Sequence, residues 1–165
     1  MTQPVLSVLV LCTGNSARSI MAEYILNAAG QGRIRAYSAG SKPTGAPNPF
    51  ALARLEKAGF DPSDARSKSW DEFAAPDAPS LDMVITVCDS AAAETCPYWP
   101  GAPLRLHWGL PDPAGVTGTD DAIAAAFDEA FGVISRRVDA MSALLPLDKA
   151  DVTLQARLQD IGKLP

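Results

Sequence analysis

The chain has 165 residues, of which 47% are apolar, and a formal net charge of −5. Its length and apolar content suit a single folded domain with its own core and exclude a disordered chain. No block of basic residues is present, which argues against nucleic acid as a partner. No apolar stretch approaches the roughly 18–20 residues that cross a bilayer. No secretion signal is visible, so we expect no membrane partner and a cytoplasmic location.

Strand and helix patterns alternate along the chain. Apolar and β-branched runs predict four strands, at Val5–Leu11, Ile34–Ser38, Met83–Val87 and Leu104–His107. Helical spacing of apolar residues predicts three helices, at Ala17–Ala29, Pro49–Ala58 and Asp120–Leu145. This alternation predicts an α/β fold with a four-stranded parallel sheet and helices on both faces. We expect one domain over residues 1–145 and a C-terminal extension with a short helix over 146–165, either packed on the domain or extending from it.

Residues 12–19 read CTGNSARS and directly follow the first predicted strand. Gly14 allows a sharp turn and Asn15 tolerates a left-handed backbone, so the segment predicts a tight loop before a helix. Backbone N–H groups at such a junction have no partner within the helix and form a nest for a tetrahedral oxyanion. The residues expected to bind that oxyanion are Thr13, Gly14, Asn15, Ser16, Ala17, Arg18 and Ser19.

Cys12 begins this oxyanion loop, residues 12–18, and Arg18 ends it. The planar guanidinium of Arg18 matches two oxyanion oxygens, and Ser19 can donate its hydroxyl to the Cys12 sulfur. We expect the helix dipole and Arg18 to lower the pKa of the Cys12 thiol, because both stabilise the thiolate. The pattern therefore predicts a thiolate nucleophile aimed at a bound oxyanion. The alternative is a buried cysteine at a strand end beside an incidental arginine.

A second segment with cysteines runs from Cys88 to Cys96, after the third predicted strand. Parallel strands meet at one sheet edge, so we expect Cys88 to lie near Cys12. Residues 89–95 predict a short helix that Pro97 stops. A continuous helix would separate the Cα atoms of Cys88 and Cys96 by roughly 12 Å, whereas a disulfide spans roughly 4.4–6.8 Å. The pair can form a disulfide only if this flap unwinds, as in a redox switch. Two unrelated buried cysteines fit the pattern equally.

A third segment, residues 107–114, reads HWGLPDPA. Prolines on both sides stiffen Asp112 in a loop that follows a strand. A carboxylic acid in that place can protonate a leaving oxygen. The alternative is an ordinary Pro–Asp–Pro turn. His107, next to Trp108, is expected to be structural.

Three cysteines, an odd number, do not fit the disulfide framework of a secreted domain. The three could offer sulfur ligands to zinc, but the chain has no CxxC pair and its one histidine, His107, lies eleven residues past Cys96. We therefore expect no metal site and no cofactor.

These motifs resemble a known family. LCTGNSARS with IMAE after it, YSAG near residue 37, TVCDSAAAETCP and HWGLPDPA are similar to the arsenate reductases built on the low-molecular-weight tyrosine phosphatase fold. The resemblance covers about residues 5–140. The Cys-x5-Arg loop alone indicates the wider phosphatase superfamily. The two-cysteine flap followed by HWG and DPA is more specific and favours a reductase.

The resemblance implies a thiol relay that reduces arsenate to arsenite. Cys12 attacks the arsenate that the loop and Arg18 hold, and Asp112 protonates the departing hydroxyl. Cys88 then attacks Cys12, arsenite leaves, and Cys96 moves the disulfide to the flap. A thioredoxin- or glutaredoxin-like protein reduces that disulfide, so no organic cofactor is needed.

The chain departs from some relatives in two places. Ala17 stands where many of them carry a second loop cysteine, so Cys12 is the only sulfur in the loop. Some relatives bind potassium beside the loop, and the matching Asn15, Glu23 and Ser38 are present. Lys68, however, stands where those relatives have an acidic ligand. We therefore expect potassium to have little effect.

Two other functions remain as alternatives. A phosphotyrosine or phosphomonoester phosphatase would use the same oxyanion loop, because arsenate and phosphate share shape and charge, but it has no need of Cys88 or Cys96. A non-catalytic oxyanion- or arsenic-binding protein would need neither the loop nucleophile nor a resolving thiol.

Overall fold

The computed structural model describes residues 5–88, 99 and 103–165, and its four strands form one parallel sheet. The strand order is β2-β1-β3-β4. The bounds are Leu6–Leu11 for β1, Ile34–Ala39 for β2, Met83–Thr86 for β3 and Leu104–His107 for β4. Each predicted strand end lies within one residue of these bounds. The predicted α/β fold with a four-stranded parallel sheet is confirmed.

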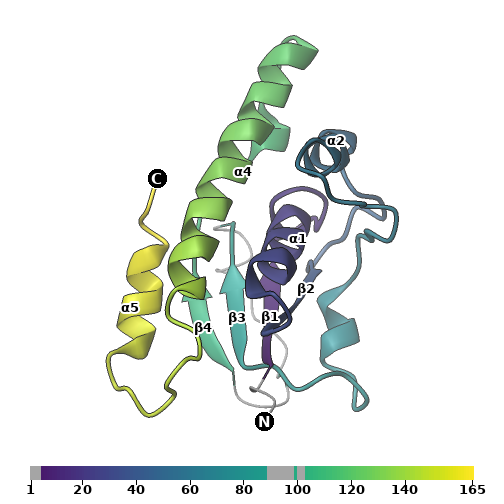
Figure 1. Cartoon of the computed structure of the whole chain (residues 1–165). Coiled ribbons are helices and arrows are strands. Elements are labelled where there is room, and N and C mark those ends of the chain that lie inside the picture. Colours follow the sequence, from purple (N-terminus) through teal and green to yellow (C-terminus); the bar gives the residue numbers. More distant parts are fainter. Residues whose placement is uncertain (1–4, 89–98, 100–102) are drawn as a thin grey trace.

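Helices connect and flank the strands (Figure 1). The α-helices are α1 at Arg18–Gly30, α2 at Pro49–Lys57, α4 at Asp120–Ser142 and α5 at Leu154–Ile161. Two short 3₁₀ helices, η1 at Trp70–Phe73 and η2 at Pro113–Gly115, lie in the connections. The side chain of Thr119 caps α4 by accepting from the Ala122 N–H. Helix α4 ends three residues before the predicted Leu145, because the chain turns toward Pro146, which disfavours helix in the residue before it.

The two faces of the sheet have different covers. Helices α1 and α4 lie over one face, with α2 beside them, and Figure 1 shows this layer in front of the strands. Val8 and Val10 of β1 are fully buried in that core. Leu9 and Leu11, which alternate with them, are buried on the opposite face with Phe73 of η1. Among the described residues, η1 is the helical element in that second layer, so a helix does cover each face.

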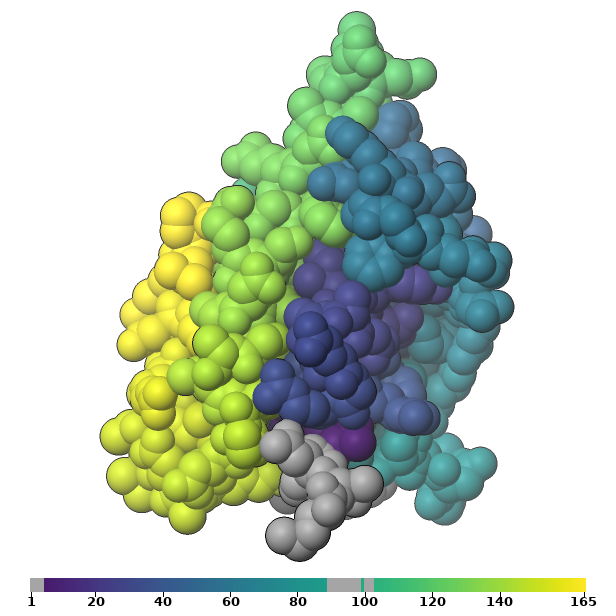
Figure 2. All heavy atoms as spheres, viewed as in Figure 1, coloured from purple at the N-terminus to yellow at the C-terminus, as the bar shows by residue number. Residues whose placement is uncertain are grey.

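The segment after residue 145 packs on the domain and does not extend from it. Helix α5 contacts β4 and α4, and Leu154 and Leu158 are buried in the same core as α1 and α4. Figure 2 shows α5, in yellow, against α4, in green. No helix within the described ranges is long and apolar enough to cross a membrane.

Candidate active site

Asn15 holds the oxyanion loop together from inside the protein. Its φ is 45°, in the left-handed region that the sequence predicted for it, and its side chain is fully buried. The Asn15 Nδ2 donates to Ser19 Oγ over 2.8 Å, and Asn15 Oδ1 accepts from the Lys68 N–H over 2.9 Å. One side chain therefore ties the loop to the first turn of α1 and to the segment between α2 and η1.

The loop carbonyls point outward and are bound there. Lys42 and Thr44 N–H groups donate to the Thr13 and Gly14 carbonyls, each over 3.0 Å. Position 40 must be glycine, because a Cβ there would lie 2.4 Å from the Thr13 oxygen. The N–H groups of residues 15–17 have no hydrogen-bond partner in the part of the chain that the structure describes. Carbonyls bound outside and donors left over inside are what an oxyanion nest requires.

Arg18 reaches across the site from the start of α1. It is buried, and its Nη1 donates to the carbonyls of Leu110 and Val87 over 2.8 and 3.4 Å. Its Nη2 lies 3.8 Å from Cys12 Sγ and 3.7 Å from an oxygen of Asp112. Its Nε is buried without a partner among the described residues. The guanidinium therefore lies close to both the predicted nucleophile and the predicted acid, and its Nε remains as a further donor.

The pKa of the Cys12 thiol moves in the opposite direction from the one predicted. A hydrogen bond with Cys88 raises it most, and burial raises it further. Arg18 and the Gly14 N–H lower the pKa, as expected for a loop of this kind, but by less. The predicted Ser19–Cys12 bond is also wrong: within the described ranges Ser19 bonds Asn15 and not the sulfur. The sequence prediction failed because it considered the loop without its neighbour Cys88.

Cys88 lies beside the loop, as its place after β3 predicted. Both Cys12 and Cys88 are buried. The Cys88 sulfur accepts from the Thr13 N–H over 3.3 Å and lies 3.5 Å from the Thr13 hydroxyl. The sheet thus brings two thiols together that are 76 residues apart in sequence. Cys96, the predicted helix over 89–95 and its stop at Pro97 lie outside the described residues.

Asp112 lies in the turn that the sequence left as one alternative, and its carboxyl group lies near Arg18. One carboxylate oxygen accepts from the Ala114 N–H over 3.0 Å, which makes Asp112 the cap of η2. The other oxygen lies 3.7 Å from Arg18, and the side chain is 49% exposed. The Pro–Asp–Pro turn is therefore real, and it places a carboxyl group at the mouth of the loop. His107 is held by Thr86, whose Oγ1 lies 2.8 Å from His107 Nδ1.

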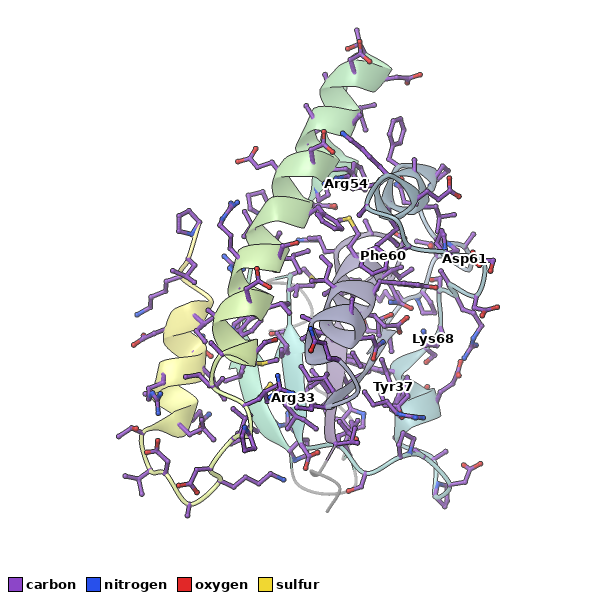
Figure 3. All side chains as sticks on the ribbon, in the orientation of Figure 1. Arg33, Tyr37, Arg54, Phe60, Asp61 and Lys68 are labelled. Carbon is purple, nitrogen blue, oxygen red and sulfur yellow. The ribbon has the colours of Figure 1, made fainter. Side chains whose placement is uncertain are left out.

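Lys68 forms a buried ion pair behind the loop. Its ammonium lies 3.7 Å from Glu23 Oε1, and both side chains are largely buried, 8% and 19% exposed. Ser38 donates to the same Glu23 oxygen over 3.1 Å. Burial lowers the pKa of Lys68 and raises that of Glu23, whereas their mutual attraction opposes both shifts. Figure 3 labels Lys68 on the segment that leads from α2 to η1.

The zinc alternative depends on Cys96, which lies outside the described residues. Within the described ranges, no group of three or more histidine, cysteine, aspartate or glutamate side chains gathers in a way that could hold a metal ion. Glu23 and Asn15, which match the potassium ligands of some relatives, both contact Lys68: Glu23 pairs with its ammonium and Asn15 accepts from its N–H.

Comparison with known proteins identifies the fold family. The sequence model of the low molecular weight phosphotyrosine protein phosphatases matches residues 7–151. The chain belongs to the low molecular weight phosphotyrosine protein phosphatase family. This match includes the oxyanion loop, Cys88 and Asp112 and ends before α5.

Within this family, the similar proteins include arsenate reductases. Similar solved structures also include a low molecular weight protein tyrosine phosphatase of T. tengcongensis, with a TM-score of 0.59 at 27% identity over 78% of this chain and 95% of that one. The chain is 37% identical over 134 residues to an arsenate reductase of Halalkalibacterium halodurans, covering 78% of this chain and 88% of that one. A solved structure of an arsenate reductase in the phosphate-binding state superimposes with a TM-score of 0.68 at 28% identity, over 84% of this chain and 98% of that one. A thioredoxin-dependent arsenate reductase of Corynebacterium glutamicum superimposes with a TM-score of 0.61 at 27% identity, over 87% of this chain and 65% of that one.

Proposed function

We infer that this protein reduces arsenate to arsenite with a relay of cysteine thiols. The observation that carries this inference is the pairing of Cys88 with Cys12 at an oxyanion loop, since a phosphatase needs one of these thiols and a reductase needs both. The similarity to arsenate reductases supports the substrate, and a relative solved with phosphate bound supports a tetrahedral oxyanion in such a site.

The first step uses the oxyanion loop and Asp112. The loop N–H groups and Arg18 hold arsenate, and the Cys12 thiolate attacks arsenic. An As–S bond forms and one As–O bond breaks. Asp112, 3.7 Å from Arg18 at the mouth of the loop, gives its proton to the departing oxygen, which leaves as water. The hydrogen bond with Cys88 raises the pKa of Cys12, so opening that bond would favour the thiolate.

The second step moves two electrons onto arsenic. Cys88, as thiolate, attacks the Cys12 sulfur, the S–S bond forms and the As–S bond breaks with its electron pair on arsenic. Arsenic(V) becomes arsenic(III) and leaves as arsenite. The sum is arsenate plus two thiols giving arsenite, water and a Cys12–Cys88 disulfide.

The third step regenerates the loop. In this proposal the Cys96 thiolate attacks Cys88, which frees Cys12 and leaves a Cys88–Cys96 disulfide. A thioredoxin-like dithiol then reduces that bond, and the thioredoxin-dependent relative supports this class of reductant. A reducing compartment such as the cytoplasm suits a protein that must keep three thiols reduced between turnovers.

The decisive experiment counts arsenite released per enzyme. Without any reductant, the reduced wild type should release one arsenite per chain and then stop. With thioredoxin, thioredoxin reductase and NADPH, release should continue. Cys96→Ser should give the single release but no cycling, because Cys12 and Cys88 suffice for one turnover. Cys88→Ser should give neither.

Hydrolysis of p-nitrophenyl phosphate by the same variants tests the phosphatase alternative. If Cys88→Ser cycles arsenate at the wild-type rate, the relay is wrong. If the wild type releases no arsenite but hydrolyses the ester, the protein is a phosphatase. Cycling with glutathione and glutaredoxin instead of thioredoxin would change the partner only.

A further inference from the structure

The loop that carries Asp112 is fixed from the far end of the chain. We call residues 108–112, between β4 and η2, the acid loop. Arg137 of α4 is buried, and its Nη1 donates to the carbonyls of Trp108 and Gly109 over 2.8 and 3.2 Å. Its Nε donates to the carbonyl of Leu164 over 3.0 Å. A single buried guanidinium thus joins the acid loop to the segment after α5.

Helix α5 holds the start of the same loop. The side-chain amide of Gln159 accepts from the His107 N–H over 3.1 Å and donates to the His107 carbonyl over 2.9 Å. The indole N–H of Trp108 donates to the carbonyl of Leu158 over 3.0 Å. Gly162 lies so close to Trp108 that a Cβ there would come within 2.5 Å of the indole ring. The pairing of Gln159 with a backbone N–H and C=O fixes His107 as a further strand would.

The acid loop, in turn, contacts the groups that react. The Leu110 carbonyl accepts from Arg18 Nη1 over 2.8 Å, and Asp112 lies 3.7 Å from Arg18 Nη2. Gly109, which Arg137 holds, is the residue before Leu110. A shift of the acid loop would therefore move a partner of Arg18 and the carboxyl group of Asp112 together.

We propose that Arg137 and Gln159 are positioning residues that hold the acid loop where Arg18 and Asp112 act on the oxyanion. The family model matches residues 7–151, so Gln159 and Leu164 lie outside the matched range. This inference rests on the proposed function for the role of Asp112. The role of Arg18 in binding an oxyanion needs only the loop.

The chain offers a matched control for each residue. Arg136 precedes Arg137, but it is exposed and donates to the Pro165 carbonyl. Within the described ranges it makes no hydrogen bond to an acid-loop residue. Gln155 lies one turn before Gln159 on α5 and donates to the Arg105 carbonyl, which is outside the acid loop. The test variants are Arg137→Met and Gln159→Ala, and the controls are Arg136→Met and Gln155→Ala.

Two readouts are measured at a temperature where circular dichroism shows every variant folded. The first is kcat and KM for arsenate with thioredoxin. We expect kcat/KM of the test variants to fall on the order of tenfold, with a lower kcat and a higher KM, because small displacements of catalytic groups slow the reaction. The second readout is protection of Cys12 from iodoacetamide by inorganic phosphate, which should need several times more phosphate in the test variants. The controls should stay within twofold of the wild type.

The inference is overturned if Arg137→Met and Gln159→Ala keep wild-type kcat/KM and phosphate protection while only their melting temperatures fall, since that result assigns them a structural role alone. Equal losses in the control variants would also overturn it. Gln159→Ala leaves the buried arginine in place, so it decides the question even if Arg137→Met does not fold. If the wild type fails to reduce arsenate, the proposed function fails, and phosphate protection still tests the positioning of Arg18.

Discussion

The oxyanion loop is held by neighbours in the first half of the chain, whereas the acid loop is held by α4 and α5 near its other end. Asn15 fixes the oxyanion loop through its left-handed backbone and through its buried side-chain amide, which accepts from the Lys68 N–H. Gly40 allows the close approach of the backbone to Thr13. Arg137 and Gln159 fix the acid loop. Both loops are held by contacts that are distant in sequence, since Lys68 lies 53 residues from Asn15 and Gln159 lies 52 residues from His107. The active site therefore joins a loop fixed by the segments around Gly40 and Lys68 to a loop fixed by α4 and α5. Changes in α5 should reach the acid and leave the nucleophile in place.

The largest effect should come from a change in the oxyanion loop. Cys12→Ser should lower arsenate reduction by at least about 10³-fold, because serine does not ionise at neutral pH as a thiol can. The same loss should appear in any phosphatase activity. Phosphate binding, measured by calorimetry, should persist because the loop N–H groups and Arg18 remain. Substantial turnover in this variant would place the nucleophile elsewhere.

A change in the acid loop should give a smaller but clear loss of activity. Asp112→Asn removes the proton donor and should lower kcat for arsenate by about 10²-fold, with KM changed far less. Asp128→Asn is the matched control, because Asp128 has similar exposure and pairs with Arg54 away from the site. Equal kcat values for Asp112→Asn and the wild type would remove Asp112 from the chemistry and leave it only as the cap of η2.

A third variant tests how far the reactivity of Cys12 depends on its neighbour Cys88. The hydrogen bond with Cys88 is the largest cause of the raised pKa of Cys12, so Cys88→Ala should lower that pKa. Below its pKa, the thiolate fraction rises tenfold for each unit that the pKa falls. Alkylation of Cys12 at neutral pH should therefore be faster in the variant, by about tenfold if the pKa falls by one unit. Peptide mass spectrometry across a pH series distinguishes Cys12 from Cys96, and an unchanged profile would refute this account.

The smallest effect on activity should come from the ion pair behind the loop, where the cost is in stability. Lys68→Met leaves the buried Glu23 carboxylate uncompensated and should destabilise the fold by about 3 kcal/mol near neutral pH. Without Lys68, the already raised pKa of Glu23 should rise further. A carboxyl group whose pKa is raised on folding stabilises the folded state while it is protonated, and that stabilisation is lost as pH rises above its unfolded-state pKa. The loss of stability in Lys68→Met relative to the wild type should therefore grow from about pH 5 to pH 8.

Urea unfolding of both proteins across that range measures the deficit, and Lys68→Met/Glu23→Gln should recover most of it. A deficit that is constant with pH would contradict the role of Glu23. In the wild type, melting temperatures in sodium and potassium salts at matched ionic strength should agree, because the Lys68 ammonium already lies 3.7 Å from Glu23. A stabilisation specific to potassium would show that the ion pair does not replace a cation.

The elements of the fold could be predicted from the sequence because their signals are local. The alternating strand and helix patterns placed β1 to β4 to within one residue, and the CTGNSARS motif predicted the left-handed Asn15. Helix α4 was placed too long at its end, because the helical pattern of apolar residues runs past the turn toward Pro146. The place of Cys88 beside the oxyanion loop followed from the rule that strand ends meet at one edge of a parallel sheet.

The sequence by itself determined which residues could do chemistry, because a thiol is a nucleophile, a guanidinium a cation and a carboxyl group an acid by residue type. Only the tertiary structure decided the state in which they meet. The direction of the Cys12 pKa depends on burial and on Cys88, 76 residues away, and the support of the acid loop depends on where α5 packs. Electrostatic energies vary with distance and with exposure to water, and neither quantity can be read from residue order.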